Sequence, residues 1–155
     1  MNSVPGTHDF RFIENVWIEL SDGIRLAASL WLPADASERT PVPAVLEVIP
    51  YRKRDATAAR DFQSHSYLAA YGFAGCRLDM RGCGDSEGRH DARQTYADIE
   101  EVLAWLARQP WCDGNLGMMG LSWGGINAIM AADRHAPGLK AVMASSFSSD
   151  RYADG

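Results

Sequence analysis

The chain lacks an excess of basic residues. Among its 155 residues, Lys and Arg total 15 and Asp and Glu total 20, which gives a formal net charge of −5 at pH 7. A negatively charged chain is a poor partner for nucleic acid, whose phosphates attract clustered positive charge. The one basic cluster, Arg52-Lys53-Arg54, is too short to form a patch. The charge therefore argues against a nucleic-acid-binding protein.

Long apolar runs and targeting signals are also lacking. No stretch approaches the roughly 18 consecutive apolar residues that a transmembrane helix needs. The opening segment, MNSVPGTHDF, has neither the basic n-region nor the apolar h-region of a secretory signal peptide. We therefore expect a cytoplasmic protein with no membrane partner.

Cysteine is scarce. Cys76, Cys83 and Cys112 are odd in number and show no CxxC spacing. That argues against both a disulfide framework and a zinc site. We expect three reduced thiols, and the alternative is one disulfide plus a spare thiol in an extracellular protein.

What the sequence does contain is an ordinary globular composition, with 46% hydrophobic and 23% charged residues. Its length allows one domain with one core. Apolar patterning predicts strands at 16–20, 24–32, 44–49, 73–80, 115–121 and 139–144. It predicts helices at 62–71 and 123–134, and another through Tyr96, Ile99, Val102, Leu103 and Leu106 that Pro110 closes.

The order of these elements predicts the fold class. From Pro43 onward, strands and helices alternate, which is typical of a parallel sheet with helices on both faces. The first two predicted strands flank the turn signal Ser21-Asp22-Gly23 and should form an antiparallel hairpin at the sheet edge. We therefore predict an α/β fold with a mostly parallel sheet.

One motif carries chemistry. Gly120-Leu121-Ser122-Trp123-Gly124 matches G-x-S-x-G and lies between a predicted strand and a predicted helix. A nucleophilic serine needs such a sharp turn, and glycines at 120 and 124 remove the collisions that side chains would make there. The N–H of Trp123, at the helix N-terminus, would face the oxygen of an attacked carbonyl. The alternative is a turn in which the Ser122 hydroxyl only caps the helix.

Further stretches accompany this motif. They are the hairpin around Asp22-Gly23, the segment Ile49-Pro50-Tyr51-Arg52, the Gly-rich loop Asp79-Met80-Arg81-Gly82-Cys83-Gly84-Asp85-Ser86-Glu87-Gly88, and the segment from Gln109-Pro110-Trp111-Cys112-Asp113-Gly114 to Gly125. With them the chain resembles the N-terminal part of the α/β-hydrolase domain of the cocaine esterase / X-Pro dipeptidyl-peptidase (CocE/NonD, peptidase S15-like) family. The resemblance implies that residues 1–155 form a partial α/β-hydrolase fold.

The resemblance also implies roles for particular residues. Ser122 is the nucleophile, the Tyr51 hydroxyl and the Trp123 N–H form the oxyanion hole, and Gly120 and Gly124 are the elbow glycines. It implies a serine acyl hydrolase that cleaves a small ester, amide or peptide substrate through an acyl-enzyme, with no cofactor and no metal.

The sequence does not supply the rest of a catalytic triad. In α/β-hydrolases the order is Ser, then acid, then His. The one histidine after Ser122 is His135, 13 positions on, and a helix between them would separate the two by about 20 Å. His8, His65 and His90 precede the serine. We interpret Asp150 as a loop carboxylate, although some α/β-hydrolases place their acid after the corresponding strand.

We therefore predict an N-terminal fragment whose triad acid and histidine lie in family segments beyond it, and an inactive isolated chain. A non-catalytic interaction protein, or a half-enzyme completed by a partner chain, is the alternative. Two weaker alternatives use the Gly-rich loop. Gly82, Gly84 and Gly88 nearly match a dinucleotide fingerprint, and Asp79, Asp85 and Glu87 are carboxylates that could bind a metal.

Overall fold

The computed structural model describes residues 8–91 and 93–148. In this part of the chain, six strands form one sheet in the order β1-β2-β4-β3-β5-β6. The elements along the chain are β1 (Phe10–Glu19), β2 (Arg25–Pro33), β3 (Val42–Ile49), α1 (Ala58–Ala70), β4 (Ala74–Asp79), α2 (Thr95–Ala107), β5 (Cys112–Leu121), α3 (Trp123–Asp133) and β6 (Leu139–Ser145). The strands from β3 to β6 pair in parallel, whereas β2 is antiparallel to both β1 and β4. The predicted α/β fold is confirmed.

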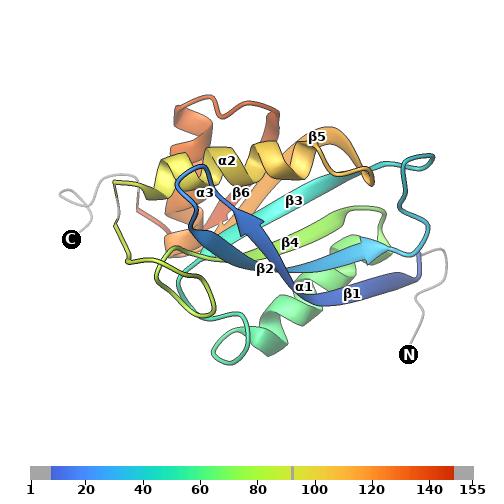
Figure 1. Cartoon of the computed structure of the whole chain (residues 1–155). Coiled ribbons are helices and arrows are strands. Elements are labelled where there is room, and N and C mark those ends of the chain that lie inside the picture. Colours follow the sequence, from blue (N-terminus) through green and yellow to red (C-terminus); the bar gives the residue numbers. More distant parts are fainter. Residues whose placement is uncertain (1–7, 92, 149–155) are drawn as a thin grey trace.

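The helices lie on both faces of the sheet. Helices α2 and α3 contact each other and β5, whereas α1 contacts β4, β2 and β1 (Figure 1). Each parallel strand is joined to the next by one helix, because parallel strands need a crossover connection. As a result, the carboxyl ends of β3, β4, β5 and β6 lie at one edge of the sheet, which is where ligands bind in open α/β folds.

Helix α2 follows its predicted pattern closely. Ile99, Val102, Leu103 and Leu106 recur at helical spacing, and all four are fully buried. All four belong to the hydrophobic core cluster. The apolar periodicity was therefore sufficient to place this helix.

Helix α1 begins earlier than predicted. The prediction started at Phe62, but the helix starts at Ala58 and Phe62 is exposed. The buried face of α1 consists of Asp61, His65 and Ala69, at steps of four residues. Because two of these three residues are polar, hydrophobic periodicity could not detect that face.

Strands β1 and β5 are also longer than predicted. Strand β1 starts at Phe10 instead of Val16, and its pairing with β2 shifts register between Ile13 and Val16. Such an irregularity breaks the alternation from which a strand is recognised. Strand β5 starts at Cys112 instead of Asn115.

All three cysteines are free thiols. Burial raises the pKa of Cys76 to about 12, and burial also raises the pKa values of Cys83 and Cys112. The prediction of unpaired cysteines is confirmed. Separately, within residues 8–91 and 93–148 no helix has the length and apolar character needed to cross a membrane.

Gly75 in β4 provides a test of this packing. A Cβ at Gly75 would lie 2.7 Å from His65 Nδ1, whereas a Cβ at Gly117 in β5 would meet its nearest atom at 3.6 Å. Gly75→Ala should therefore lower the free energy of unfolding by roughly 1–3 kcal/mol through overpacking. Gly117→Ala is the matched control and should be near neutral. Urea denaturation measures both, and equal effects of the two substitutions would contradict this packing.

Candidate active site

Ser122 lies in a strained turn between β5 and α3. Its backbone has φ 56° and ψ −116°, a conformation that non-glycine residues rarely adopt. The turn is fixed on both sides, because the Ser122 N–H donates to Ser145 O at 3.0 Å and Ser122 O accepts from the Ile126 N–H at 3.1 Å. The residue is exposed, so this conformation presents its hydroxyl at the carboxyl edge of the sheet.

The two flanking glycines are required by close contacts. A Cβ at Gly120 would lie 2.1 Å from the carbonyl carbon of Gly124. A Cβ at Gly124 would lie 2.5 Å from Ile49 Cγ2, on the neighbouring strand β3. The first collision, between the two sides of the turn, was predictable from the sequence, whereas the second, with another strand, was not.

The Ser122 hydroxyl does not cap α3. Ser122 occupies the N-cap position of the helix, yet its side chain makes no capping hydrogen bond. The hydroxyl instead accepts a hydrogen bond from the Tyr51 hydroxyl, with 3.3 Å between the two oxygens. The capping alternative is therefore wrong for this serine.

The parallel pairing of β3 with β5 explains why Tyr51 and Ser122 meet. Tyr51 follows the end of β3 at Ile49, and Ser122 follows the end of β5 at Leu121. Residues 71 positions apart in sequence thus lie on adjacent loops at one sheet edge. Tyr51 is 36% exposed, so its hydroxyl is accessible to a ligand at Ser122.

Trp123 is the first residue of α3 and follows Ser122 directly. The first N–H groups of a helix carry a partial positive charge and attract anions. The indole of Trp123 is half-buried, and the ring of His90 stands against it with 5.9 Å between centroids. Tyr51, Ser122 and Trp123, all singled out from the sequence, are therefore brought together at this edge.

The histidines within the described residues make no hydrogen bond to Ser122. His65 is fully buried on α1, where it stacks on Trp31 and lies 3.3 Å from Glu47 Oε2. His8 pairs with Asp35 on the surface. Within residues 8–91 and 93–148, no histidine is hydrogen-bonded to the Ser122 hydroxyl, whose partner is Tyr51. The candidate acid Asp150 lies outside the described residues.

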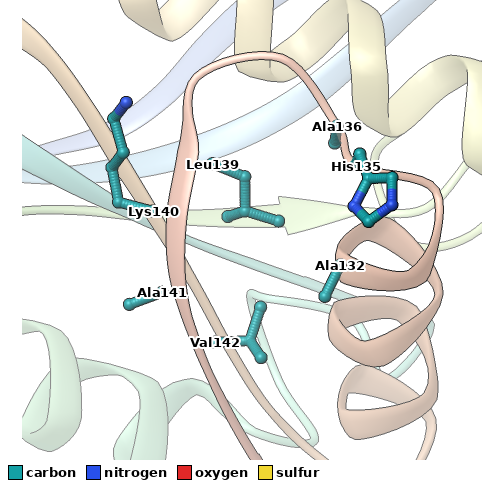
Figure 2. A pocket seen from close by; sticks show the side chains of 7 residues that line it. All are labelled: Ala132, His135, Ala136, Leu139, Lys140, Ala141 and Val142. Atoms are coloured by element: carbon teal, nitrogen blue, oxygen red, sulfur yellow. The ribbon is translucent and has the colours of Figure 1, made fainter.

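His135 lies at the wrong end of α3. The helix starts beside Ser122 and ends at Asp133, which separates its two ends by about 16 Å. His135 follows in the turn toward β6 and borders a hollow of about 260 Å³ (Figure 2). The other lining residues are Ala132, Ala136, Leu139, Lys140, Ala141 and Val142. This hollow is near the amino end of β6, whereas Ser122 is at the carboxyl edge.

The nucleotide-binding alternative fails on the position of α2. A dinucleotide fingerprint opens directly into a helix, but α2 begins only at Thr95, well after Gly88. Gly82 and Gly84 have positive φ values of 70° and 54°. A Cβ at Gly84 would lie 2.0 Å from Asp79 Oδ2. These glycines therefore serve the packing of their own loop.

The carboxylates proposed as metal ligands have protein partners. Asp85 pairs with Lys53 and Arg54, and Glu87 pairs with Arg25. Burial tends to raise the pKa of Asp85, but the hydrogen bond from Lys53 and the charge of Arg54 bring it below its ordinary value. In the part of the chain that the structure describes, no group of three or more His, Cys, Asp or Glu side chains is arranged to hold a metal ion.

Sequence reasoning missed a buried charged layer beneath the site. Lys53, Arg77 and Asp79 are buried, and Lys53 belongs to the loop that carries Tyr51. Lys53 belongs to the basic cluster that is too short to form a patch, and Asp79 belongs to the Gly-rich stretch, whose carboxylates were weighed as metal ligands. No signal in the sequence separates a buried ion pair from a solvated one, because the difference depends on tertiary packing.

Comparison with known proteins agrees with this geometry. The family model for X-Pro dipeptidyl-peptidase (S15 family) matches residues 22–155. Cocaine esterase from Rhodococcus sp. (strain MB1 Bresler) is 39% identical over 147 residues, which cover 93% of this chain and 25% of the esterase. The chain thus spans about a quarter of the length of that relative.

Solved structures show the same fold. A CocE/NonD family hydrolase from Staphylococcus aureus matches with a TM-score of 0.74 and 21% identity over 86% of this chain and 27% of that one. An α-amino acid ester hydrolase matches with a TM-score of 0.73 and 23% identity over 96% of this chain and 27% of that one.

The parallel sheet, the helices on both faces and the serine turn after β5 define an α/β-hydrolase-like fold. More narrowly, the chain belongs to the X-Pro dipeptidyl-peptidase (S15) family. The resemblance to CocE/NonD hydrolases is confirmed.

The contact between Gly124 and Ile49 predicts a specific coupling. Gly124→Ala and Ile49→Ala should each destabilise the protein, the second by roughly 2–5 kcal/mol. Their combined effect should fall short of the sum by about 1 kcal/mol or more, because removing Cγ2 makes room for the new methyl group. Free energies of unfolding of the single and double variants measure this coupling.

Gly120→Ala combined with Ile49→Ala is the control. The Cβ at residue 120 collides with the backbone of Gly124 and not with Ile49. The loss of unfolding free energy caused by Gly120→Ala should therefore add to the loss caused by Ile49→Ala. Equal coupling for both glycines would show that the turn is not packed as described.

Proposed function

We propose that the protein is a serine acyl hydrolase in which Ser122 attacks an ester or amide carbonyl and forms an acyl-enzyme. The observation that carries this proposal is the exposed Ser122 hydroxyl on a strained strand-to-helix turn, 3.3 Å from the Tyr51 hydroxyl. A serine held in this way is positioned for nucleophilic attack. Membership of a hydrolase family supports the same reaction class.

We propose that Tyr51 and Trp123 stabilise the transition state. As the carbonyl becomes tetrahedral, its oxygen acquires negative charge, which two hydrogen-bond donors can stabilise. The Tyr51 hydroxyl is one donor, and the N–H of Trp123 at the start of α3 is the other. The Tyr51 O–H donates to Ser122 in the free protein and would turn to the substrate oxygen.

The general base comes from outside the described residues in this proposal. Ser122 needs a histidine within about 3 Å, and the histidine needs an orienting acid. In the proposed complete enzyme both follow Ser122 in a longer polypeptide, in the order usual for this fold. The histidine accepts the serine proton and returns it to the leaving group, and water then releases the acyl product.

We propose a small ester as the substrate class, with amides and X-Pro peptides as the alternative. A cocaine esterase that is 39% identical over nearly the whole chain favours esters. No cofactor takes part in this chemistry. The three free thiols fit the reducing conditions of the cytoplasm, which we propose as the location.

A half-enzyme completed by a partner chain is the second candidate. It rests on the finding that, within the described ranges, the Ser122 hydroxyl has no histidine partner. The intact mass of the gene product from its own cells separates the two candidates. A mass several times 17.0 kDa supports one long chain, whereas a mass near 17.0 kDa favours a partner that carries the acid and histidine.

Substitution of Ser122 and Tyr51 tests the proposed function. In the protein expressed from its complete coding sequence, Ser122→Ala should lower kcat for a nitrophenyl ester by roughly 10⁴-fold or more. Tyr51→Phe should lower kcat by roughly 10²–10³-fold with little change in KM, because it removes one donor to the developing oxyanion.

Two matched controls accompany these variants. Ser146 is exposed, has φ 50° and follows the neighbouring strand β6, so Ser146→Ala should retain the activity. Tyr67 is 61% exposed on α1, so Tyr67→Phe should also retain it. Unchanged turnover in Ser122→Ala would reject the assignment of the nucleophile.

A further inference from the structure

We propose that Asp79 is a positioning residue for the oxyanion hole, because its buried carboxylate fixes the loop that carries Tyr51. This inference rests on the proposed function, since it assumes that Tyr51 acts on the substrate oxygen. Asp79 itself does not reach the reacting atoms in this account. It acts through the backbone of Lys53, two residues beyond Tyr51.

The Asp79 carboxylate joins two loops. Asp79 is the last residue of β4, and its side chain is 1% exposed. Its Oδ1 accepts the backbone N–H of Lys53 at 2.9 Å, in the loop after β3. Its Oδ2 accepts the backbone N–H of Asp85 at 3.1 Å, in the Gly-rich loop after β4. A hydrogen bond from a backbone N–H to an ionised carboxylate is stronger than one to a neutral acceptor.

The loop after β3 needs such a restraint. Arg52, between Tyr51 and Lys53, has φ 56°, which is unfavourable for a residue with a Cβ. Backbone strain of this kind persists only where surrounding contacts hold it. The bond from the Lys53 N–H to Asp79 holds the residue immediately after the strained one, so it determines where Tyr51 stands relative to Ser122.

The Lys53 side chain supplies a second attachment for the same loop. It is 1% exposed, and its Nζ lies 3.1 Å from Asp85 Oδ2 and 3.3 Å from Glu14 O. Glu14 lies within the register shift between β1 and β2, and its carbonyl oxygen accepts a hydrogen bond from Lys53 Nζ. Asp85 is in turn bound through its own N–H to Asp79. Backbone and side chain of Lys53 are therefore both tied to the Asp79 cluster.

An asparagine could not replace this aspartate. Two N–H groups point at the two carboxylate oxygens, whereas an amide has only one oxygen acceptor and its NH₂ would face a donor. Arg77 is fully buried. Its Nη1 lies 3.2 Å from Asp79 Oδ1, and its Nε lies 2.8 Å from Asp61 Oδ2. The arginine thus balances the buried charge of Asp79 and also has a second acidic partner.

The test is a double-mutant cycle in the protein expressed from its complete coding sequence, with a nitrophenyl ester as substrate. Asp79→Asn should lower kcat by roughly 10²-fold, as expected when a catalytic group is misplaced by about 1 Å. The double variant Asp79→Asn/Tyr51→Phe should have a kcat within about twofold of that of Tyr51→Phe alone. Both changes remove the same donor, so their effects should not add.

Asp61→Asn is the matched control. Asp61 is equally buried and pairs with the same arginine, but it makes no bond to the backbone of Lys53. Asp61→Asn should lower the stability of the protein but should lower kcat by no more than about twofold. Any such loss of kcat should multiply with the loss caused by Tyr51→Phe. A general structural role for Asp79 would give this same multiplicative result.

Lys53→Met is the second variant if Asp79→Asn does not fold. It leaves the bond from the Lys53 N–H to Asp79 intact and tests the side-chain attachment of the same loop to Asp85, whose N–H Asp79 holds. It keeps the apolar stem and removes the Nζ attachment, and its kcat loss should likewise be absorbed by Tyr51→Phe. Two results would overturn the inference and leave the proposed function standing. In the first, Tyr51→Phe lowers kcat but a folded Asp79→Asn does not. In the second, the kcat losses of the two single variants multiply in the double variant. No loss in Tyr51→Phe would reject the role of Tyr51, and the positioning role of Asp79 with it.

Discussion

The close approach of β5 to the first turn of α3 is the constraint on which the site depends. Ser122 is held at φ 56° because no Cβ stands at residue 120 or 124. A methyl group at residue 120 would meet the Gly124 backbone at 2.1 Å, and backbone atoms there cannot move without displacing the helix. The hydroxyl is therefore exposed by backbone geometry and not by an accident of rotamer choice.

The rest of the site follows from the parallel sheet. Because β3 and β5 pair in parallel, their carboxyl ends bring Tyr51 and Ser122 together although the two residues are 71 positions apart in the sequence. Strand β4 lies on the other side of β3 and ends in Asp79, which reaches the loop that bears Tyr51. Three neighbouring strands thus contribute a nucleophile candidate, an oxyanion donor candidate and the acid that we propose positions that donor.

The sequence allowed prediction of the features that rest on local pattern. The apolar spacing of Ile99, Leu103 and Leu106 placed α2, and the G-x-S-x-G motif placed the turn at Ser122. The α/β fold followed from the alternation of elements. These features are predictable because each depends on residues close together in the chain.

Features that depend on tertiary contacts escaped prediction. The start of α1 was missed because Asp61 and His65 fill its buried face, and their burial is stabilised by Arg77 and Glu47 from other strands. The Lys53–Asp79 bond was missed because it joins the loop after β3 to the end of β4, and these become neighbours only when β3 and β4 pair. Burial of a charged group is set by its partners, which a linear pattern does not show.

The most direct test of the central claim is a crystal structure of the protein with a boronic acid that mimics the tetrahedral intermediate. The account predicts a bond between boron and Ser122 Oγ, and one boronate oxygen within about 3.2 Å of both the Tyr51 hydroxyl oxygen and the Trp123 backbone nitrogen. A boronate bound to another residue would contradict the account. So would one on Ser122 whose oxygens all face solvent, away from Tyr51 and Trp123.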